Sequence, residues 1–497
     1  MASSLATSWE VWVILLPLTA AVLSFLFGRR SEAPLLVLTA ILMAAALAAL
    51  TQRVARSGPV THRIGGWEAP LGIELHADGL ALLLLGVTAV VVLVAGLYAR
   101  GLIACDGDRE GCGNPAFWPL WFFFWGALNA LYLSRDIFNL YVTLELLTLS
   151  AVPLIALAGT RALFAGMRYL LVALLGSLAY LLGVALLYAV HGTLSLTLLG
   201  PAVQGGAPVF GAMALLTVGL VLKTALFPLH FWLPETYAQA PSPVSALLAA
   251  LATKASFYVL LRLWFEVFPA EFKPAAGQLL GVLGAAAVLW GSLQALRQSR
   301  VKYLLAYSSI AQIGYLFFLF PLAGSSFGLA PQTPAAAAAW GGALFLILAH
   351  ACAKGAMFLA AGCMVHAVGS DRIGDLTGVG QHLRRPLFAF SLGGITLMGL
   401  PPSGGFSSKW LFLNAAVVEG QWWWVPVMIA GGLLAAAYVI RLVRQALVFL
   451  PVDIRFQPVP GSMQWPALVL ALLSILLGLG GAFPVDFLSL GTSGGAP

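Results

Sequence analysis

Lysine is scarce in this sequence, and most of it lies inside apolar segments. Of the six lysines in the chain, four are surrounded by long apolar runs, namely Lys223, Lys254, Lys354 and Lys409. Arginine is instead found mainly between such runs. A buried ammonium can release its proton near neutral pH, whereas a guanidinium effectively never does. This division of the basic residues indicates proton transfer within the apolar segments.

One acidic residue, Glu145, lies well within an apolar run, in NLYVTLELLTLSAVPLIAL. A charge in such a place requires a partner or a hydrated cavity. Three histidines lie in or beside other runs: His230, His350 and His366. A lone histidine on an apolar face is more often a packing residue than a functional one. For Lys354, His366 and Arg262, snorkelling to a helix end or a packing ion pair explains the residue as well as function does.

The set as a whole favours a proton relay over packing. Five members lie in five different apolar runs, each near the middle of its run or beside a break: Glu145, Lys223, Lys254, His350 and Lys409. Ionisable groups in this arrangement are typical of proton pathways. His230 and Lys354 are further candidates for the same site. We expect no cofactor and no metal site, because the sequence has neither a dinucleotide fingerprint nor clustered cysteines.

The elements that carry these residues are membrane helices. A chain that is 61% hydrophobic and 9% charged, with mean hydropathy +0.96, cannot cover the surface of a soluble globule. Apolar runs of about 20 residues, the length of a membrane-crossing helix, recur along the whole sequence. We count fourteen of them, at 10–28, 33–51, 77–99, 115–133, 137–159, 162–190, 208–226, 243–268, 275–295, 303–322, 335–366, 387–413, 422–446 and 464–485. The prediction is an all-α, multi-pass membrane protein whose first run is retained rather than cleaved.

The basic residues between the runs predict the orientation. With the N-terminus outside, fifteen lysines and arginines fall in inner loops and only five in outer loops. Because short cytoplasmic loops carry the excess of positive charge, both termini are expected on the outer, periplasmic side of a bacterial inner membrane. The outer segment from Thr51 to Leu75 is a candidate for a short hairpin.

Two runs are interrupted by proline. In LKTALFPLHFWLP, residues 222–234, Pro228 removes a backbone donor and is expected to free the carbonyl of Thr224 beside Lys223. In GLPPSGGFSSKWLFLNAA, residues 399–416, two prolines and two glycines precede Lys409. Broken helices at membrane depth are tolerated only where they line a cavity or are buried in protein. We therefore expect both breaks to lie at the relay.

Paired breaks in two halves of a chain indicate inverted repeats with a site at their interface. The predicted organisation is an N-terminal group of three helices (1–114), a five-helix repeat (115–268), a second five-helix repeat (269–449) and a C-terminal helix (450–497). Four cysteines are too few for a disulfide framework, and Cys105 and Cys112 are expected to be free loop thiols.

Several long segments resemble the antiporter-like subunits shared by respiratory complex I, membrane-bound hydrogenases and Mrp-type cation/proton antiporters. They are FWPLWFFFWGALNALYLSRDIFNLYVTLELL, LVLKTALFPLHFWLPETYAQAPSPVSALLAALATKASFYVLLRL, VKYLLAYSSIAQIGY and LPPSGGFSSKW. The resemblance spans nearly the whole chain. Two segments, GGWEAPLGIELHADGLALLLL (65–85) and SRDIFNLYVTLELL, make it closest to the D-type polypeptide of Mrp antiporters.

The resemblance implies a role for each candidate residue. Glu145 matches the glutamate that pairs with the lysine of the first broken helix, here Lys223. Lys254 matches the central lysine, His350 the histidine of the eleventh helix, and Lys409 the basic residue of the second broken helix. His230 matches the histidine after the first break. The complex I M-type subunit usually has glutamate where this chain has Lys409, which favours the antiporter type.

The function expected from these residues is proton translocation by one subunit of a multisubunit Na+/H+ antiporter, with other membrane subunits as partners and no nucleic acid. Alternatives are the equivalent module of a redox-driven complex, where the chain would act as part of a translocase, and a module of an energy-coupled inorganic carbon uptake system. A non-transporting scaffold is a third class. The intramembrane lysines argue against it, because packing alone does not require them.

Overall fold

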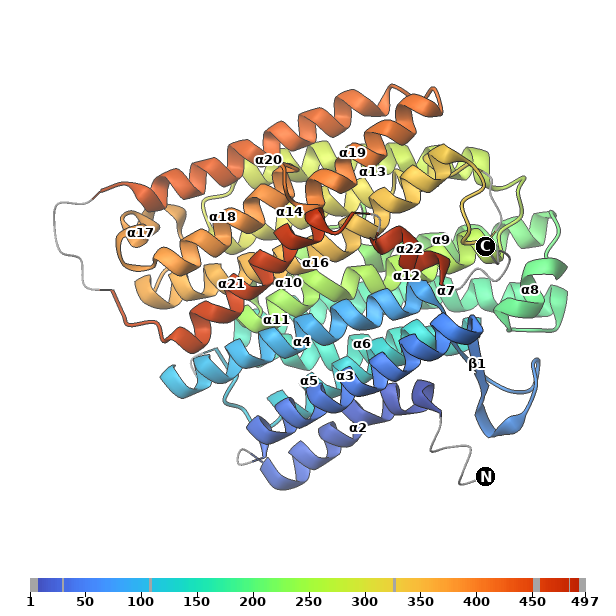
Figure 1. Ribbon diagram of the computed structural model, residues 1–497, viewed down its shortest axis with the longest axis horizontal. Coiled ribbons are helices and arrows are strands. Elements are labelled where there is room, and N and C mark those ends of the chain that lie inside the picture. Colours follow the sequence, from blue (N-terminus) through green and yellow to red (C-terminus); the bar gives the residue numbers. More distant parts are fainter. Residues whose placement is uncertain are drawn as a thin grey trace.

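A computed structural model describes residues 8–28, 31–106, 110–324, 328–449, 456–481 and 483–490. These residues form an elongated bundle of helices that run roughly side by side (Figure 1). Within these ranges, twelve helical segments are long and apolar enough to cross a membrane. They are α2 (Trp9–Phe27), α3 (Glu32–Ser57), α4 (Gly79–Asp106), α6 (Ile137–Ala156), α7 (Thr160–His191), α9 (Ala207–Thr224), α11 to α12 (Ser242–Glu266), α13 (Lys273–Arg297), α14 to α15 (Val301–Leu322), α16 (Pro334–Val368), α20 (Trp424–Leu447) and α21 to η5 (Gly461–Leu479). The chain is thus an all-α, multi-pass membrane protein.

The other predicted runs are helical but shorter. α5 (Phe117–Leu133) has 17 residues, and the run at 387–413 is divided into α18 (Arg384–Met398) and α19 (Gly404–Val418), with 15 residues each. The count of fourteen spans therefore stays a prediction. Short helices complete the described chain: α8 (Leu196–Ala202), η2 (Ile64–Gly66), α10 (Leu233–Gln239), η4 (Ile373–Leu376), α17 (Val379–His382) and α22 (Phe483–Ser489).

A small β-hairpin marks one end of the bundle. β1 (Val60–Arg63) pairs antiparallel with β2 (Glu74–Ala77), within the segment where a hairpin was expected. The hydroxyl of Ser8, just before α2, lies 3.3 Å from Nδ1 of His62, and α22 packs against Gly79 at the start of α4. Both described ends of the chain therefore lie at this end, which we call the hairpin end (Figure 1).

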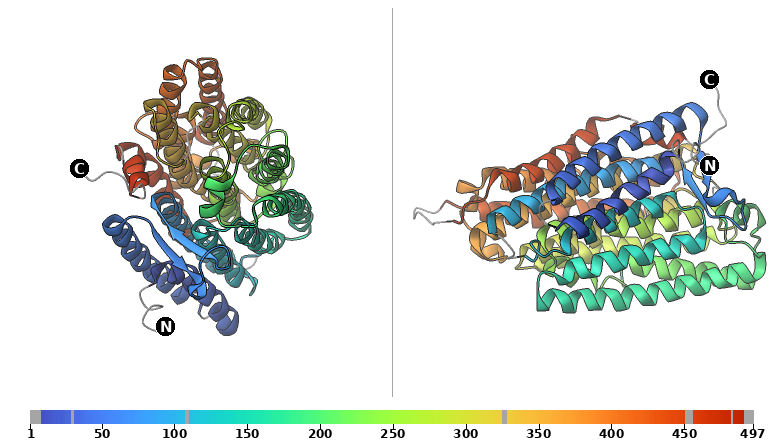
Figure 2. Two further views of the ribbon diagram at one scale, coloured as in Figure 1. Left: turned by 90° about the vertical axis from the view of Figure 1, so that its right-hand side faces the viewer. Right: turned by 90° about the horizontal axis from the view of Figure 1, so that it is seen from below.

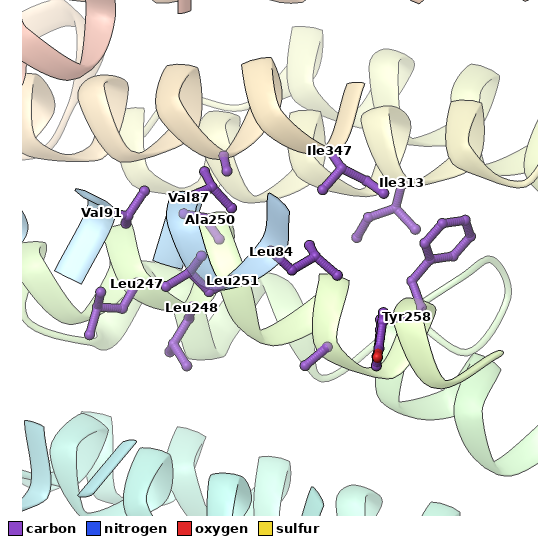
Figure 3. Packing of buried hydrophobic residues seen from close by; sticks show 14 of the residues in the cluster. Leu84, Val87, Val91, Leu247, Leu248, Ala250, Leu251, Tyr258, Ile313 and Ile347 are labelled. Atoms are coloured by element: carbon purple, nitrogen blue, oxygen red, sulfur yellow. The ribbon is translucent and has the colours of Figure 1, made fainter. Parts of the chain in front are cut away.

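The centre of the bundle is occupied by α16 and by the segment from α11 to α12. The most apolar stretch of α16 is entirely buried, and that of α11 to α12 is almost entirely so. Figure 3 shows Leu84 and Val87 of α4 near Ala250 and Leu251, and Ile347 of α16 beside Ile313 of α14. α2 and α20 lie at opposite margins (Figures 1 and 2). The central helices carry Lys254, His350 and Lys354, which places these residues away from the lipid.

In two pairs of neighbouring helices, the two backbones come close where a glycine of one helix faces a glycine of the other. A Cβ on Gly219 of α9 would lie 2.4 Å from the carbonyl oxygen of Gly176 in α7, and one on Gly176 would lie 2.9 Å from that of Gly219. Gly284 of α13 and Gly314 of α14 meet in the same reciprocal way. Small residues allow such close backbone contact between membrane helices. The first pair fixes the part of α9 that carries Lys223.

Gly219→Ala is expected to separate α7 from α9, because the new methyl group would meet backbone rather than a movable side chain. Overpacking of this kind typically costs about 1–3 kcal/mol. We expect a lower thermal unfolding temperature of the assembly in nanodiscs. Gly211→Ala, on the same helix, is the control, since nothing lies within 4 Å of its added Cβ. Equal stability of the two variants would contradict the packing argument.

Candidate functional site

Glu145 and Lys223 form a buried ion pair between α6 and α9. The Lys223 ammonium lies 2.9 Å from Oε1 of Glu145, and the side chains of Lys223 and Glu145 are 7% and 16% exposed. Ser177 of α7 donates a hydrogen bond to the same carboxylate oxygen. The carboxylate is therefore held by groups from two neighbouring helices, as a charge at this depth requires.

The helix break beside Lys223 begins earlier than Pro228. α9 ends at Thr224, and Ala225 adopts the left-handed conformation at φ 60°, which is uncommon for a residue with a side chain. The carbonyl of Leu222 accepts hydrogen bonds of 3.2 Å from the Ala225 amide and of 3.0 Å from the Trp232 indole. The carbonyl with an observed new partner is thus Leu222's and not the expected one of Thr224, because the chain turns before the proline is reached.

A pair of hydroxyls connects the first break to α12. Thr224 donates a 3.0 Å hydrogen bond to Ser256, which lies two residues after Lys254. The turn before Lys254 is η3 (Leu248–Ala252), a π-helical turn within the segment from α11 to α12. π-turns inside α-helices are frequent at functional sites. The Lys254 ammonium donates to the carbonyl of Ala249 within this turn.

His350 and Lys354 of α16 lie beside Lys254, and the three groups interact electrostatically. The Lys354 ammonium donates a 2.8 Å hydrogen bond to the carbonyl of Leu305 and a second one to Ser308 of α14. His350 Nε2 is buried and has no hydrogen-bond partner among the described residues. Three basic side chains are thus grouped in the centre of the bundle, with neutral oxygen atoms as the acceptors of both ammonium groups.

Lys409 binds the end of the second broken helix. Its ammonium donates hydrogen bonds of 2.7 and 3.0 Å to the carbonyls of Leu397 and Met398, the last two residues of α18. It also lies 4.7 Å from the centroid of the Tyr315 ring. A cation is stabilised at the carboxyl end of a helix by the free carbonyls and the helix dipole. Gln312 of α14 donates to the same Leu397 carbonyl, which connects Lys409 to the centre of the bundle.

We call the series Glu145, Lys223, Lys254, His350, Lys354 and Lys409 the polar axis. Sequence reasoning proposed all of these residues but missed the hydroxyls and the amide near them, namely Thr224, Ser256, Ser308 and Gln312. His230 lies in the turn after α9, where its ring stacks on Phe227 at 5.5 Å. His366 lies near the end of α16, with its Nε2 3.7 Å from the Cys105 sulfur. The four cysteines, all of them within the described ranges, form no disulfide, and Cys112 is buried.

Arg262 does not snorkel but forms a buried ion pair, which is the other of the two packing roles considered for it. It is 2% exposed and holds Asp78 through two hydrogen bonds of 2.6 and 2.7 Å. Its Nη1 also lies 2.8 Å from Glu266. Asp78 is therefore a further buried acid, as is Glu10, which pairs with Arg53 at 3.4 Å, and Glu266 is a largely buried one with 10% of its side chain exposed. Sequence reasoning missed them because they lie at the ends of apolar runs, where acids are ordinarily solvated.

Known proteins of one family are similar to this chain over most of its length. Residues 134–435 match the family described as "NADH:quinone oxidoreductase/Mrp antiporter, TM". The chain belongs to this family. A relative from the same family, the N-type NADH-quinone oxidoreductase subunit of Desulforudis audaxviator, is 34% identical over 94% of this chain and 95% of its own length. The D-type Na(+)/H(+) antiporter subunit of Bacillus subtilis is 30% identical over 94% and 93%.

Solved structures show the same family likeness. A chain of the Mrp complex from Dietzia sp. DQ12-45-1b is similar with a TM-score of 0.86 at 25% identity, over 98% of this chain and 97% of that one. A chain of the membrane-bound sulfane sulfur reductase, an archaeal respiratory membrane complex, gives the same TM-score at 28% identity, over 97% and 96%. The chain is therefore an antiporter-like membrane subunit that has both Mrp and complex I relatives. These matches do not decide between the expected D type of Mrp antiporters and the N type of complex I.

Proposed function

We propose that this chain is the proton-translocating subunit of a multisubunit Na+/H+ antiporter in a bacterial inner membrane. The observation that carries the proposal is the polar axis, in which a buried Glu145–Lys223 pair is continued by hydroxyls and further basic groups to Lys409. Proton pathways across proteins require such groups within reach of one another. The D-type antiporter relative and the Mrp complex chain support this choice and imply other membrane subunits as partners.

In the proposed mechanism the Glu145–Lys223 pair is a switch. When the pair is closed, the carboxylate stabilises the ammonium of Lys223. When the pair opens, the ammonium loses its counter-charge and releases its proton towards Lys254. The proton then passes by way of His350 to Lys409, and each site alters the proton affinity of the next. The titrations of such coupled groups belong to the set rather than to single residues.

The finer topology belongs to this proposal. We place fourteen membrane spans in the chain, with both termini on the periplasmic side and two inverted repeats at 115–268 and 269–449. Each proposed repeat has one break, at residues 225–232 and 399–403, and one reciprocal glycine contact between its helices. The break of the first repeat follows its lysine, whereas that of the second precedes it.

The second candidate is the proton-pumping module of a redox-driven complex. It is favoured by the 34% identity to an N-type oxidoreductase subunit over nearly the whole chain. The two candidates differ in what drives transport, since the polar axis can serve either one.

One experiment separates the candidates. The complete assembly is purified through a tag on this chain, reconstituted in liposomes and tested for a Na+-dependent pH gradient with no electron donor. We expect Na+ addition to produce the gradient. The redox-driven complex would be the correct assignment if an iron–sulfur or flavin protein copurifies and the pH gradient forms only when an electron donor is added.

A further inference from the structure

A second group of buried charges lies at the hairpin end, outside the polar axis. Arg262 of α12 binds Asp78, which directly precedes α4, and also Glu266. Arg135, in the turn between α5 and α6, binds the other oxygen of Glu266. His76 of β2 lies 3.9 Å from Asp78. We call these five residues the hairpin-end ion cluster. Its two carboxylates and two guanidinium groups balance in charge.

The cluster is joined to the polar axis by one face of α12. Lys254, Tyr258, Arg262 and Glu266 are spaced four residues apart, so their side chains follow one another along one side of the helix. The Tyr258 hydroxyl accepts a 2.9 Å hydrogen bond from Arg262 Nε and donates to the carbonyl of Tyr132. From Lys254 to Glu266 the helix rises about 18 Å. A polar stripe thus runs from the centre of the bundle to its end.

Further polar groups border this stripe. The Tyr132 ring packs edge-on against the Tyr258 ring at 5.2 Å, and Thr88 of α4 lies beside Tyr132. Both side chains are buried. Their hydroxyls supply hydrogen-bond donors and acceptors inside the bundle, where apolar side chains alone would exclude water from the stripe.

The stripe ends at a cavity of about 370 Å³. Glu266, Asp78, Arg135 and His76 line it, and the exposed residue Thr197 of α8 lies at its rim. A space of this size with charged side chains in its wall accommodates several water molecules.

The two carboxylates of the cluster are not equivalent. Both carboxylate oxygens of Asp78 accept hydrogen bonds from Arg262, and the carboxylate accepts a further 2.9 Å hydrogen bond from the Ala81 amide. Although burial opposes its ionisation, the charge and hydrogen bonds of Arg262 hold the pKa of Asp78 well below its usual range. Asp78 therefore stays ionised and keeps Arg262 neutralised. Burial and the charge of Arg135 lower the pKa of His76 to about 3, so its ring is neutral at physiological pH.

Glu266 has a different position, because it is shared between two arginines and borders the cavity. If Glu266 takes up a proton, Arg262 retains Asp78 as its counter-ion. Arg135 loses its partner, but its side chain is 17% exposed and lies in the cavity wall. Protonation of Glu266 therefore leaves no fully buried charge unpaired, whereas protonation of Asp78 would weaken the hold on Arg262.

We infer that Glu266 is the proton-exchange residue at the hairpin end, where the relay meets the water phase, and that Asp78 is a positioning residue that anchors Arg262. The inference rests on the proposed function. The ammonium of Lys254 gives a proton to water along the stripe and becomes a neutral amine. The Glu266 carboxylate receives a proton and becomes a carboxylic acid, which then releases it to water in the cavity. The reverse sequence loads Lys254 from the same side.

The test varies the pH on the hairpin side alone, in oriented vesicles that contain the complete assembly. The proton-coupled transport rate of the wild type is expected to change with the pH on the hairpin side. Glu266→Gln should lower the rate at least tenfold and remove the dependence, while Glu266→Asp should restore part of both. Besides Glu266, the groups that face this site are His76, Asp78, Arg135, Tyr258 and Arg262.

Glu10→Gln is the matched control. Glu10 is also a buried acid paired with an arginine at the hairpin end, but it does not line the cavity. Its variant is expected to keep the wild-type rate and pH dependence. Normal transport and normal pH dependence in Glu266→Gln would overturn the inference. The proposed function would survive that result as long as variants of Glu145 and Lys223 are inactive, so the two failures are distinguishable.

Blocking the cavity without touching the ion pairs provides a second test, which decides the matter if Glu266→Gln does not assemble. Thr197→Trp places a large ring at the rim from an exposed position, so the fold should tolerate it. We expect a several-fold lower rate than in Thr197→Ser. Equal rates in the two assembled variants would contradict proton exchange through this cavity.

Discussion

Replacement of Glu145 by glutamine is expected to abolish proton-coupled transport while the assembly still forms. The change removes the counter-charge that lies 2.9 Å from the Lys223 ammonium and leaves the shape of the side chain almost intact. Loss of one partner of a buried ion pair costs about 3–5 kcal/mol, which is more than about a hundredfold in the equilibrium between charged and neutral lysine. Lys223 would then no longer alternate between its two protonation states.

The measurement is quenching of a pH-sensitive dye in everted vesicles, at matched levels of assembled protein. Lys223→Ala should give the same loss, and Glu145→Asp should keep part of the activity because it retains the charge. Glu68→Gln is a suitable control, since Glu68 forms an ion pair of 2.7 Å with Arg63 on the exposed hairpin. Surface pairs of this kind contribute about 0–1 kcal/mol. More than half of the wild-type rate in Glu145→Gln would contradict the switch.

Lys409→Arg is expected to preserve folding and to stop transport. The guanidinium can still donate to the carbonyls of Leu397 and Met398 at the end of α18, so the broken helix keeps its cap. It cannot release a proton, whereas the ammonium can. The rate should therefore fall to the background of empty vesicles, while the thermal unfolding temperature stays close to that of the wild type.

Lys302→Arg is the matched control for this substitution. Lys302 is also buried and also donates to a backbone carbonyl, that of Ala240, at 3.0 Å. It lies outside the polar axis, so we expect its arginine variant to transport normally. Transport by Lys409→Arg at the wild-type rate would show that proton release from Lys409 is not a step of the cycle.

Much of the fold could be predicted from the sequence, because the bilayer imposes a simple rule on helix length. Each predicted apolar run is largely helical in the structure, and most ends agree within about three residues. α3 and α4 instead extend six and seven residues beyond the predicted runs, to Ser57 and Asp106, and the last run is divided between η5 and α22. The run at 208–226 ends at the first break, and the run at 387–413 is divided by the second. There, Ala225 and Gly399 both adopt positive φ, and proline alone could not indicate at which residue the helix stops. The residues alone indicate only that Glu145 needs a partner, and the resemblance to antiporter-like subunits implies that this partner is Lys223.

The connections within the site could not be predicted. Asp78 and Arg262 are 184 residues apart, and nothing local to either residue indicates the other. Within the described part of the chain Lys409 has no acidic partner, because its acceptors are the backbone carbonyls of Leu397 and Met398. Serine and threonine are common in membrane helices, so Ser256 and Thr224 carry no signal until the packing of α9 against α12 is known.

The π-turn at Leu248–Ala252 has a consequence for how this helix tolerates insertion and deletion. A π-turn holds one residue more than an α-helical turn, so deleting one residue there would restore a regular α-helix. The residues beyond the turn would keep nearly the same orientation after that deletion. If the same residues formed a regular α-helix without it, every residue beyond the turn would be rotated by about 100° about the helix axis relative to the residues before it. Lys254 and the three residues that follow it along the same face would turn away from their partners together. The single extra residue thus sets the phase of the whole polar face of α12.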